Sequence, residues 1–299
     1  MGEKKASIMI GIGEILWDML PEGRQMGGAP ANFACHATQL GSEGVVISSV
    51  GNDQNGADIL DLLEKKKVQH LISTNEEYPT GTVSVDMDDA GVPSYTIHED
   101  VAWDHIQLGE HHIKLAEKAD AICYGSLALR HPESAQAIYQ CIAATPSTSI
   151  RIFDVNLRQD YFDGEKIHKM LDLSTVLKLN DEELLVVSDL LFLSGSETTL
   201  LELLLNVYDL DLIILTKGEF GSRLFSRAMG DSIVKGKNVE VVDTVGAGDS
   251  FTAAVATGLH LDMPLDKIHH FAANVAAYVC SQAGATPELP PLGQLVHGD

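Results

Sequence analysis

Short apolar segments alternate with longer amphipathic segments along most of the 299-residue chain. Apolar positions recur at helical spacing in the longer segments, whereas the short ones are nearly continuous runs. Strands that alternate with helices build a mostly parallel sheet with helices on both faces, which is an α/β fold. The predicted strands are 7–12, 45–50, 121–124, 150–154, 176–179 and 212–216, and the predicted helices are 29–40, 53–67, 132–144, 165–171, 181–190, 197–208, 246–259 and 265–281.

One region departs from this alternation. Apolar and polar residues alternate with a period of two over Thr82–Met87, the turn residues Asp88–Gly91 follow, and Ser94–His98 reads as a returning strand. We expect a small antiparallel lid that covers a site beside the main sheet, with a surface hairpin of no function as the alternative. Because no segment resembles a linker, the chain is predicted to form one domain over 1–299 with a surface tail over 286–299.

Charge narrows the classes of function. The 43 acidic and 20 basic residues give a formal charge of −23, which disfavours binding to nucleic acid or to anionic membranes. The start of the chain lacks a signal-peptide pattern, and no apolar run is long enough to cross a membrane. The four cysteines are widely spaced in apolar surroundings, which predicts buried thiols in a reducing compartment. Together these observations predict a soluble cytoplasmic protein.

Candidate chemistry lies in Asp243–Phe251, where small residues precede a long apolar helix. Gly246, Ala247 and Gly248 let the backbone approach a ligand closely, and the first amides of the helix favour a phosphate. Asp249 follows directly, where a carboxylate could take a proton from an attacking hydroxyl. The chain has neither the P-loop pattern nor the dinucleotide-binding glycine pattern. The alternative is an ordinary glycine-rich helix start with an aspartate that offsets the dipole.

Four motifs together resemble the ribokinase-like (PfkB) carbohydrate kinases. They are the family's C-terminal signature at 242–251, its N-terminal signature at 27–32, its Asn-x-x-Glu motif at 180–183 and its nucleotide-site strand end at 216–218. The motifs occur in family order and span nearly the whole chain. Segments 13–18, 27–34 and 125–130 are most similar to bacterial fructokinases within that family.

The resemblance assigns roles on the sugar side of the site. Asp249 is the implied base, and the amides of Gly246, Ala247, Gly248 and Asp249 form the implied anion hole. At a helix N-terminus this carboxylate should be a weak base, which suffices because the hydroxyl becomes acidic late in phosphoryl transfer. The implied sugar contacts are Asp18, Gly28, Asn32 and Arg158. Read without the family, these are a loop acid, a turn glycine, a first-turn polar residue and a surface arginine.

The resemblance also assigns the nucleotide side. Asn180 and Glu183 would organise Mg²⁺ through water, although the same spacing is that of a helix capping box, and both readings can hold. Implied nucleotide contacts are Thr216, Gly218 and Asn274, with Asn274 alternatively part of a buried polar network. Asp243 and the carbonyl of Val245 resemble part of a monovalent-cation site, for which K⁺ is the candidate.

The resemblance therefore implies an ATP-dependent sugar kinase with the ribokinase-like fold and a lid formed by about 13–28 and 80–105. Its implied reaction converts D-fructose to fructose 6-phosphate with ATP and Mg²⁺. A kinase for ribose or 2-keto-3-deoxygluconate is one alternative, and a non-catalytic sugar- or nucleotide-binding relative is another. Because relatives often dimerise through the lid, the resemblance also implies a homodimer.

Overall fold

A nine-stranded sheet forms the centre of the computed structural model, which describes residues 6–20, 23–87 and 93–296. Seven neighbouring strands pair in parallel. The last two strands in the chain lie at one edge, and each of them pairs antiparallel with the strand before it. In spatial order the strands are β13 (Gly230–Val234), β12 (Ser222–Ser226), β11 (Leu212–Thr216), β10 (Val176–Asn180), β9 (Ile150–Asp154), β8 (Ala121–Gly125), β1 (Ile8–Ile12), β4 (Glu43–Gly51) and β5 (Gln69–Asn75).

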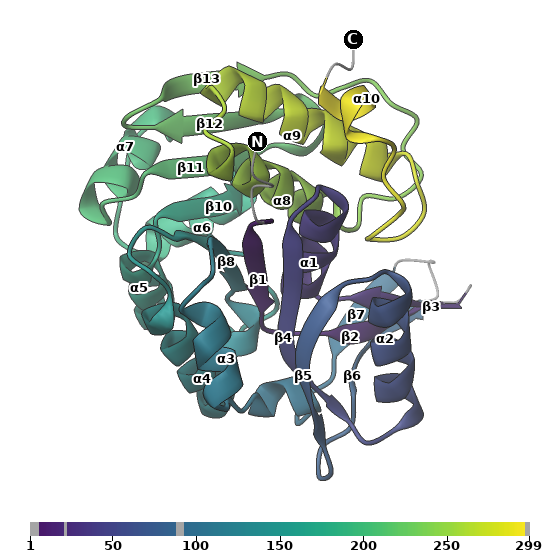
Figure 1. The fold of residues 1–299 in the computed structure, drawn as a ribbon. Coiled ribbons are helices and arrows are strands. Elements are labelled where there is room, and N and C mark those ends of the chain that lie inside the picture. The colour runs from purple at the N-terminus through teal and green to yellow at the C-terminus, as the bar shows by residue number, and fades with distance from the viewer. Residues whose placement is uncertain (1–5, 21–22, 88–92, 297–299) are drawn as a thin grey trace.

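Helices cover both faces of this sheet, as the alternating pattern predicted (Figure 1). One face packs against α3 (Glu110–Ala116), α4 (Pro132–Ala144), α5 (Gly164–Leu173), α6 (Asp181–Leu190) and α7 (Glu197–Val207). The other face packs against α1 (Ala29–Gln39), α2 (Gln54–Lys65), α8 (Ala247–His260) and α9 (Leu265–Cys280).

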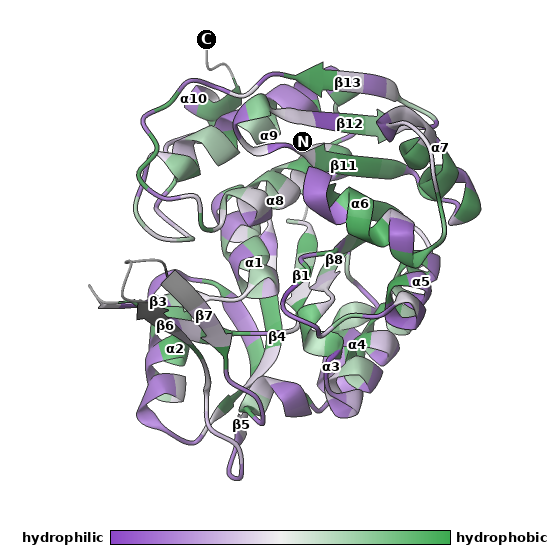
Figure 2. Cartoon of the chain, turned by 180° about the vertical axis from the view of Figure 1, so that it is seen from behind, coloured by the Kyte–Doolittle hydropathy of each residue, from purple (hydrophilic) through white to green (hydrophobic). Residues whose placement is uncertain are grey.

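The strands are apolar throughout because both of their faces are buried. In β11, Ile213 and Leu215 join the core beneath α4–α7, whereas Leu212 and Ile214 join the core beneath α1, α8 and α9. Figure 2 shows this contrast between the apolar strand β11 and the mixed polar and apolar surface of α6. Among the described residues, no helix combines the length and the apolar character needed to cross a membrane.

A second sheet of four strands lies beside the first and fits the predicted lid (Figure 1). Its order is β3 (Gly23–Gly27), β2 (Leu16–Leu20), β6 (Gly81–Met87) and β7 (Pro93–Ile97). The antiparallel pairing of β6 with β7 confirms the predicted hairpin, whose turn at 88–91 lies outside the described residues. Within this sheet β2 pairs with β3 antiparallel and with β6 in parallel.

The sequence pattern did not predict several of the strands and some of the helices. Strands β2, β3, β5, β12 and β13 and helix α3 were not predicted. The expectation of a plain tail over 286–299 was also wrong. Residues Leu292–Val296 form the short helix α10, and Leu295 is buried against the core that contains α9. The thiols of Cys35, Cys123 and Cys141 are buried as predicted, and that of Cys280 is half-buried.

Candidate active site

The turn before α8 requires glycine at its N-cap. Gly246 adopts a left-handed conformation with φ 77°, and a Cβ there would lie 2.1 Å from the carbonyl oxygen of Ala285. Helix α8 then begins at Ala247, one residue after the predicted start. The glycine therefore permits both the turn and the close approach of the 285 loop.

The first turn of α8 offers open hydrogen-bond donors. The N–H of Ala247 donates to the carbonyl of Thr244 at 3.3 Å, and that of Ser250 donates to the carbonyl of Gly246 at 2.9 Å. Within the described part of the chain, no hydrogen bond uses the N–H groups of Gly248 and Asp249. Three of the four amides of the predicted anion hole, those of Gly246, Gly248 and Asp249, thus have no hydrogen-bond partner among the described residues, and the last two lie at the positive end of a helix.

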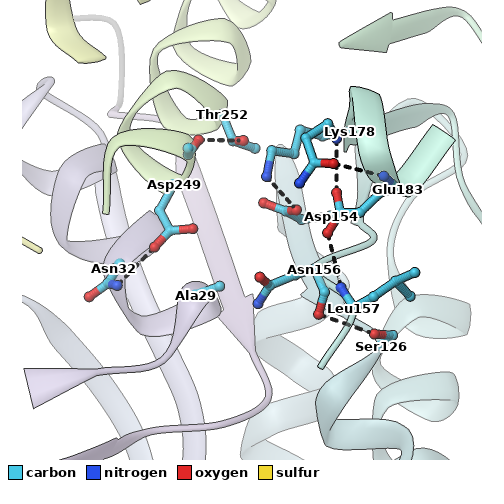
Figure 3. A network of polar contacts seen from close by, with 12 residues as sticks. Ala29, Asn32, Ser126, Asp154, Asn156, Leu157, Lys178, Glu183, Asp249 and Thr252 are labelled. Carbon is cyan, nitrogen blue, oxygen red and sulfur yellow. Dashed lines mark hydrogen bonds and ion pairs between the residues drawn. The ribbon is translucent and has the colours of Figure 1, made fainter. Parts of the chain in front are cut away.

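Asp249 is hydrogen-bonded to a segment that lies far from it in the sequence. Its Oδ2 accepts a hydrogen bond of 2.8 Å from Nδ2 of Asn32, which is buried in the first turn of α1, 217 residues away in the chain (Figure 3). Asp249 as a whole residue is half-buried. Burial raises its pKa above the ordinary value, against the opposing effects of Lys178, Asn32 and Arg158. A carboxylate with a raised pKa is a better proton acceptor than an ordinary aspartate.

Of the predicted sugar contacts, Asn32 is hydrogen-bonded to this carboxylate and Arg158 acts on it electrostatically. Asp18 is partly exposed on β2, and burial raises its pKa to about 6 in spite of the nearby positive charge of Arg158. Arg158 is exposed, donates from Nη1 to the carbonyl of Leu157 and acts electrostatically on Asp249 as well. Gly28 is the N-cap of α1 and so places its backbone at the same edge of the sheet.

Glu14 is a site residue that the sequence analysis did not single out. It follows β1, is 1% exposed, and its Oε1 accepts the N–H of Ala29 at 3.3 Å. Its Oε2 is buried without a hydrogen-bond partner among the described residues. Burial, more than the charge of Asp249, raises the pKa of Glu14 to about 7. Its position within segment 13–18, quoted above for its likeness to fructokinases, was the available signal.

The Asn-x-x-Glu motif forms a complete capping box at the start of α6. Oδ1 of Asn180 accepts the N–H of Glu183 at 2.7 Å, and Oε2 of Glu183 accepts the N–H of Asn180 at 2.8 Å. Oε1 of Glu183 also accepts the N–H of Leu157 at 3.0 Å. Because each carboxylate oxygen already has a donor, this side chain fits a magnesium ion held through water better than one bound directly.

A buried ion pair lies between this capping box and Asp249. Lys178 and Asp154 face each other across β10 and β9, and Nζ donates to Oδ1 at 2.8 Å (Figure 3). Their side chains are 9% and 3% exposed. Sequence analysis missed both residues, although Lys178 lies two positions before Asn180 and Asp154 begins the segment that contains Arg158.

The predicted nucleotide residues lie on two elements, with Thr216 and Gly218 at the end of β11 and Asn274 on α9. Thr216 ends β11 and Gly218 follows it in an exposed turn. Asn274 of α9 lines a pocket of about 560 Å³ and donates from Nδ2 to the carbonyl of Leu295 at 2.7 Å, so its alternative role in a buried polar network is also present. In the described ranges, no hydrogen bond joins Asn274 to Thr216 or Gly218.

Asp243 joins the turn before α8 to the loop at 284. Its Oδ1 accepts the N–H of Val245 at 3.0 Å, and its Oδ2 accepts the N–H of Gly284 at 3.1 Å. The structure therefore places the residues of the predicted monovalent-cation site next to one another. Oδ1 thus stabilises the turn itself, and Oδ2 joins that turn to the loop at 284.

Comparison with known proteins identifies the wider group. Residues 22–291 match the pfkB family carbohydrate kinases. An uncharacterized sugar kinase from Pyrococcus horikoshii is 31% identical over 92% of this chain and 90% of its own length, and its crystal structure in complex with ATP superposes with a TM-score of 0.80 over 96% of each chain at 30% identity. A fructokinase from Salmonella typhimurium is 29% identical over 93% of this chain and 95% of its own.

The fold agrees with these sequence relationships. The structure of a fructokinase from Xylella fastidiosa with bound ATP has a TM-score of 0.85 over 97% of each chain, at 20% identity. The predicted ribokinase-like architecture is confirmed, and the match of the family over most of the sequence decides membership. The chain belongs to the pfkB family of carbohydrate kinases, which are phosphotransferases that act on an alcohol group.

Proposed function

We propose that this protein transfers the terminal phosphoryl group of ATP to the primary hydroxyl of D-fructose and forms fructose 6-phosphate. The observation that supports the proposal is the hydrogen bond between Asn32, the proposed sugar-side amide, and Asp249, the proposed proton acceptor. Fructokinases among the relatives, including that of Salmonella typhimurium, support fructose as the acceptor.

Asp249 accepts the proton of the hydroxyl in this proposal. Asn32 holds its carboxylate in place, and burial keeps its pKa raised, so that it is ready to take a proton. The free N–H groups of Gly248 and Asp249 stabilise the negative charge on the phosphoryl group during transfer. Asp18 and the backbone at Gly28 bind the other hydroxyls of the sugar, and Arg158 binds a sugar or phosphate oxygen.

ATP approaches from the other side, beside Thr216, Gly218 and the pocket that contains Asn274. Mg²⁺, when bound to the phosphates, offsets their negative charge. Asn180 and Glu183 hold its water shell, a role that suits carboxylate oxygens already engaged by backbone donors. A monovalent cation, with K⁺ as the candidate, is assigned to Asp243 and the Val245 carbonyl.

The second sheet is proposed as a lid over the sugar, formed by about 13–28 and 80–105. We also propose that the protein is a homodimer in which two lids meet. Size-exclusion chromatography with light scattering tests this directly, because a single species with twice the mass of 32.2 kDa is expected. A monomer at every concentration would contradict the dimer and leave the lid role intact.

Another sugar, such as ribose or 2-keto-3-deoxygluconate, is the main alternative. The relative from Pyrococcus horikoshii, an uncharacterized sugar kinase, is about as similar to this chain as the fructokinases are. A non-catalytic binding protein is disfavoured because Asp249 is retained and reachable from solvent.

A panel of free sugars tests the function in one experiment. Each sugar is supplied with Mg²⁺ and ATP, release of ADP is followed by a coupled assay, and the product is assigned by ³¹P NMR. We expect fructose to exceed every other sugar in kcat/KM by about tenfold or more, as a pocket that recognises hydroxyl groups allows. Faster turnover of ribose or of 2-keto-3-deoxygluconate would replace fructose as the substrate, and no sugar-dependent ADP release would overturn the kinase proposal for this chain.

A further inference from the structure

Lys178 is a buried cation inside the candidate site. It lies on β10 with its side chain 9% exposed, and the register of the sheet sets it opposite Asp154 on β9. Its ammonium donates to Oδ1 of Asp154 at 2.8 Å. Figure 3 shows the lysine between this aspartate and the Asp249 side of the site.

Stability alone is a poor reason for such a pair. Removing two charges from water costs several kcal/mol per ion, and apolar residues of similar volume are often as stable in the same place. Tyr124 and Phe153 show that neighbouring positions of β8 and β9 are filled by apolar rings. A charged pair in this part of the sheet therefore indicates a use for the charge.

The surrounding acids keep the lysine ionised. Burial alone would lower the pKa of Lys178, but Asp154, Glu183 and Asp249 together outweigh it and hold that pKa above its ordinary value. Burial raises the pKa of Asp154 to about 6, which still leaves this carboxyl group mostly ionised at pH 7. The pair is therefore an ammonium and a carboxylate under ordinary conditions.

The ammonium also lies against the turn that binds anions. A Cβ placed on Gly248 would lie 3.2 Å from Nζ and 3.6 Å from Cε of Lys178. The same turn carries the free N–H groups of Gly248 and Asp249. A full positive charge thus adjoins two backbone donors, and this combination is suited to a phosphoryl group whose charge increases or moves during reaction.

We propose that Lys178 is a catalytic residue whose ammonium binds the phosphoryl group as it passes from ATP to the sugar, and that Asp154 positions it. The bond from the γ-phosphorus to the bridging oxygen breaks, and ADP leaves with that electron pair. The sugar oxygen forms the new bond to phosphorus, and its proton moves to Asp249. Lys178 keeps all three of its protons and contributes charge only. This proposal rests on the kinase activity and is independent of which sugar is the substrate.

Substitution of Lys178 by Met removes the charge and keeps an unbranched side chain that is one atom shorter. We expect kcat to fall by about 10²–10³-fold, as for the loss of one donor to a developing anion, with little change in KM for the sugar. Rates are measured with whichever sugar the wild-type protein phosphorylates fastest, so a wrong assignment of fructose does not affect the test.

A second variant guards against simple misfolding, because Lys178→Met leaves Asp154 buried and unpaired. The double variant Lys178→Met/Asp154→Asn removes both charges and should retain the fold. Its kcat should equal that of Lys178→Met, since Asp154 acts only through the lysine. Arg223→Met is the matched control. That arginine is also less than a tenth exposed and is paired with Glu197 and Asp231, but it lies on β12, outside the proposed contacts.

Binding of a transition-state mimic gives a readout that needs no turnover. Affinity for ADP with Mg²⁺ is compared with and without aluminium fluoride, which mimics the transferred phosphoryl group. Aluminium fluoride should increase the affinity for ADP less in Lys178→Met than in the wild type, by about the factor lost in kcat. Affinity for ADP alone should stay within about threefold of wild type. A folded double variant with near-normal kcat and an undiminished gain would overturn the proposal and leave the pair with a purely structural role.

Discussion

Replacement of Asp249 by Asn tests the proposed proton acceptor with little change of shape. Nδ2 of Asn32 can still donate to the oxygen of the new amide, so the side chain keeps its place. The substitution removes the ability to accept a proton. General-base catalysis contributes about 10²–10⁴-fold to the rate. We therefore expect kcat to fall by that factor, equivalent to about 3–5 kcal/mol in activation free energy.

The thermal stability of Asp249→Asn, unlike its activity, should not fall. Because burial raises the pKa of Asp249 in the folded protein, the folded state holds this proton more tightly than the unfolded chain does. The contribution of this group to stability is therefore lost as the pH rises from the ordinary aspartate pKa through the raised one. An asparagine has no such loss, so the variant should melt at the same temperature as the wild type or higher at pH 8, and the difference should shrink in acid.

Coupled ADP release and differential scanning fluorimetry provide the two readouts. The matched control is Asp61→Asn, which removes one negative charge from an exposed position on α2 and should alter neither. Turnover of Asp249→Asn within about tenfold of wild type would refute the role of base, since that lies below the usual range of such catalysis. A marked fall in melting temperature at pH 8 would refute the account of its burial.

Three further predictions concern the surroundings of the base. The KM for sugar should rise as pH falls through about 6, where Asp18 gains a proton and loses an acceptor, and Asp18→Asn should remove this pH dependence. Asn180→Ala removes the helix cap and should cost about 1 kcal/mol in urea denaturation while it raises KM for Mg·ATP, whereas Asn180→Ser should retain most of the stability. Gly246→Ala should destabilise more than Gly41→Ala in thermal melts, because both positions have positive φ but only Gly246 has a carbonyl within 2.1 Å of the new Cβ.

The central sheet could be predicted because each of its core strands is apolar on two faces. The five unpredicted strands lack this signature. β5 is an edge strand whose sequence, Gln69–Asn75, is largely polar and only half-buried, and β13 is mostly exposed. β2 pairs with β3 and also with β6, which lies more than sixty residues later in the chain. The local periodicity of apolar residues cannot predict a pairing with a strand so far away in the sequence.

The site divides in the same way. Residues in compact motifs, such as Gly246 and Asp249, could be located from sequence because the turn and the helix start are local. The partnership of Lys178 with Asp154 could not, because it follows from the register of β9 against β10, across 24 residues. Glu14 was overlooked for a related reason. A glutamate after a strand reads as a surface residue until the packing of α1 buries it.

Under the proposed function, three helices begin near the reacting groups, and we expect their caps to decide which helix binds the phosphoryl group. At α6, Asn180 and Glu183 cap each other, so the N–H of Glu183 already has a side-chain acceptor. At α1, the N–H of Ala29 is already directed to Glu14. Of these three helices, α8 is the one in which no side chain of the described residues accepts a hydrogen bond from the first amides. In the described part of the chain, the N–H groups of Gly248 and Asp249 have no partner. Because an incoming anion replaces water at the least satisfied donors, transfer should occur at α8, while α6 acts as a rigid support for its capping side chains.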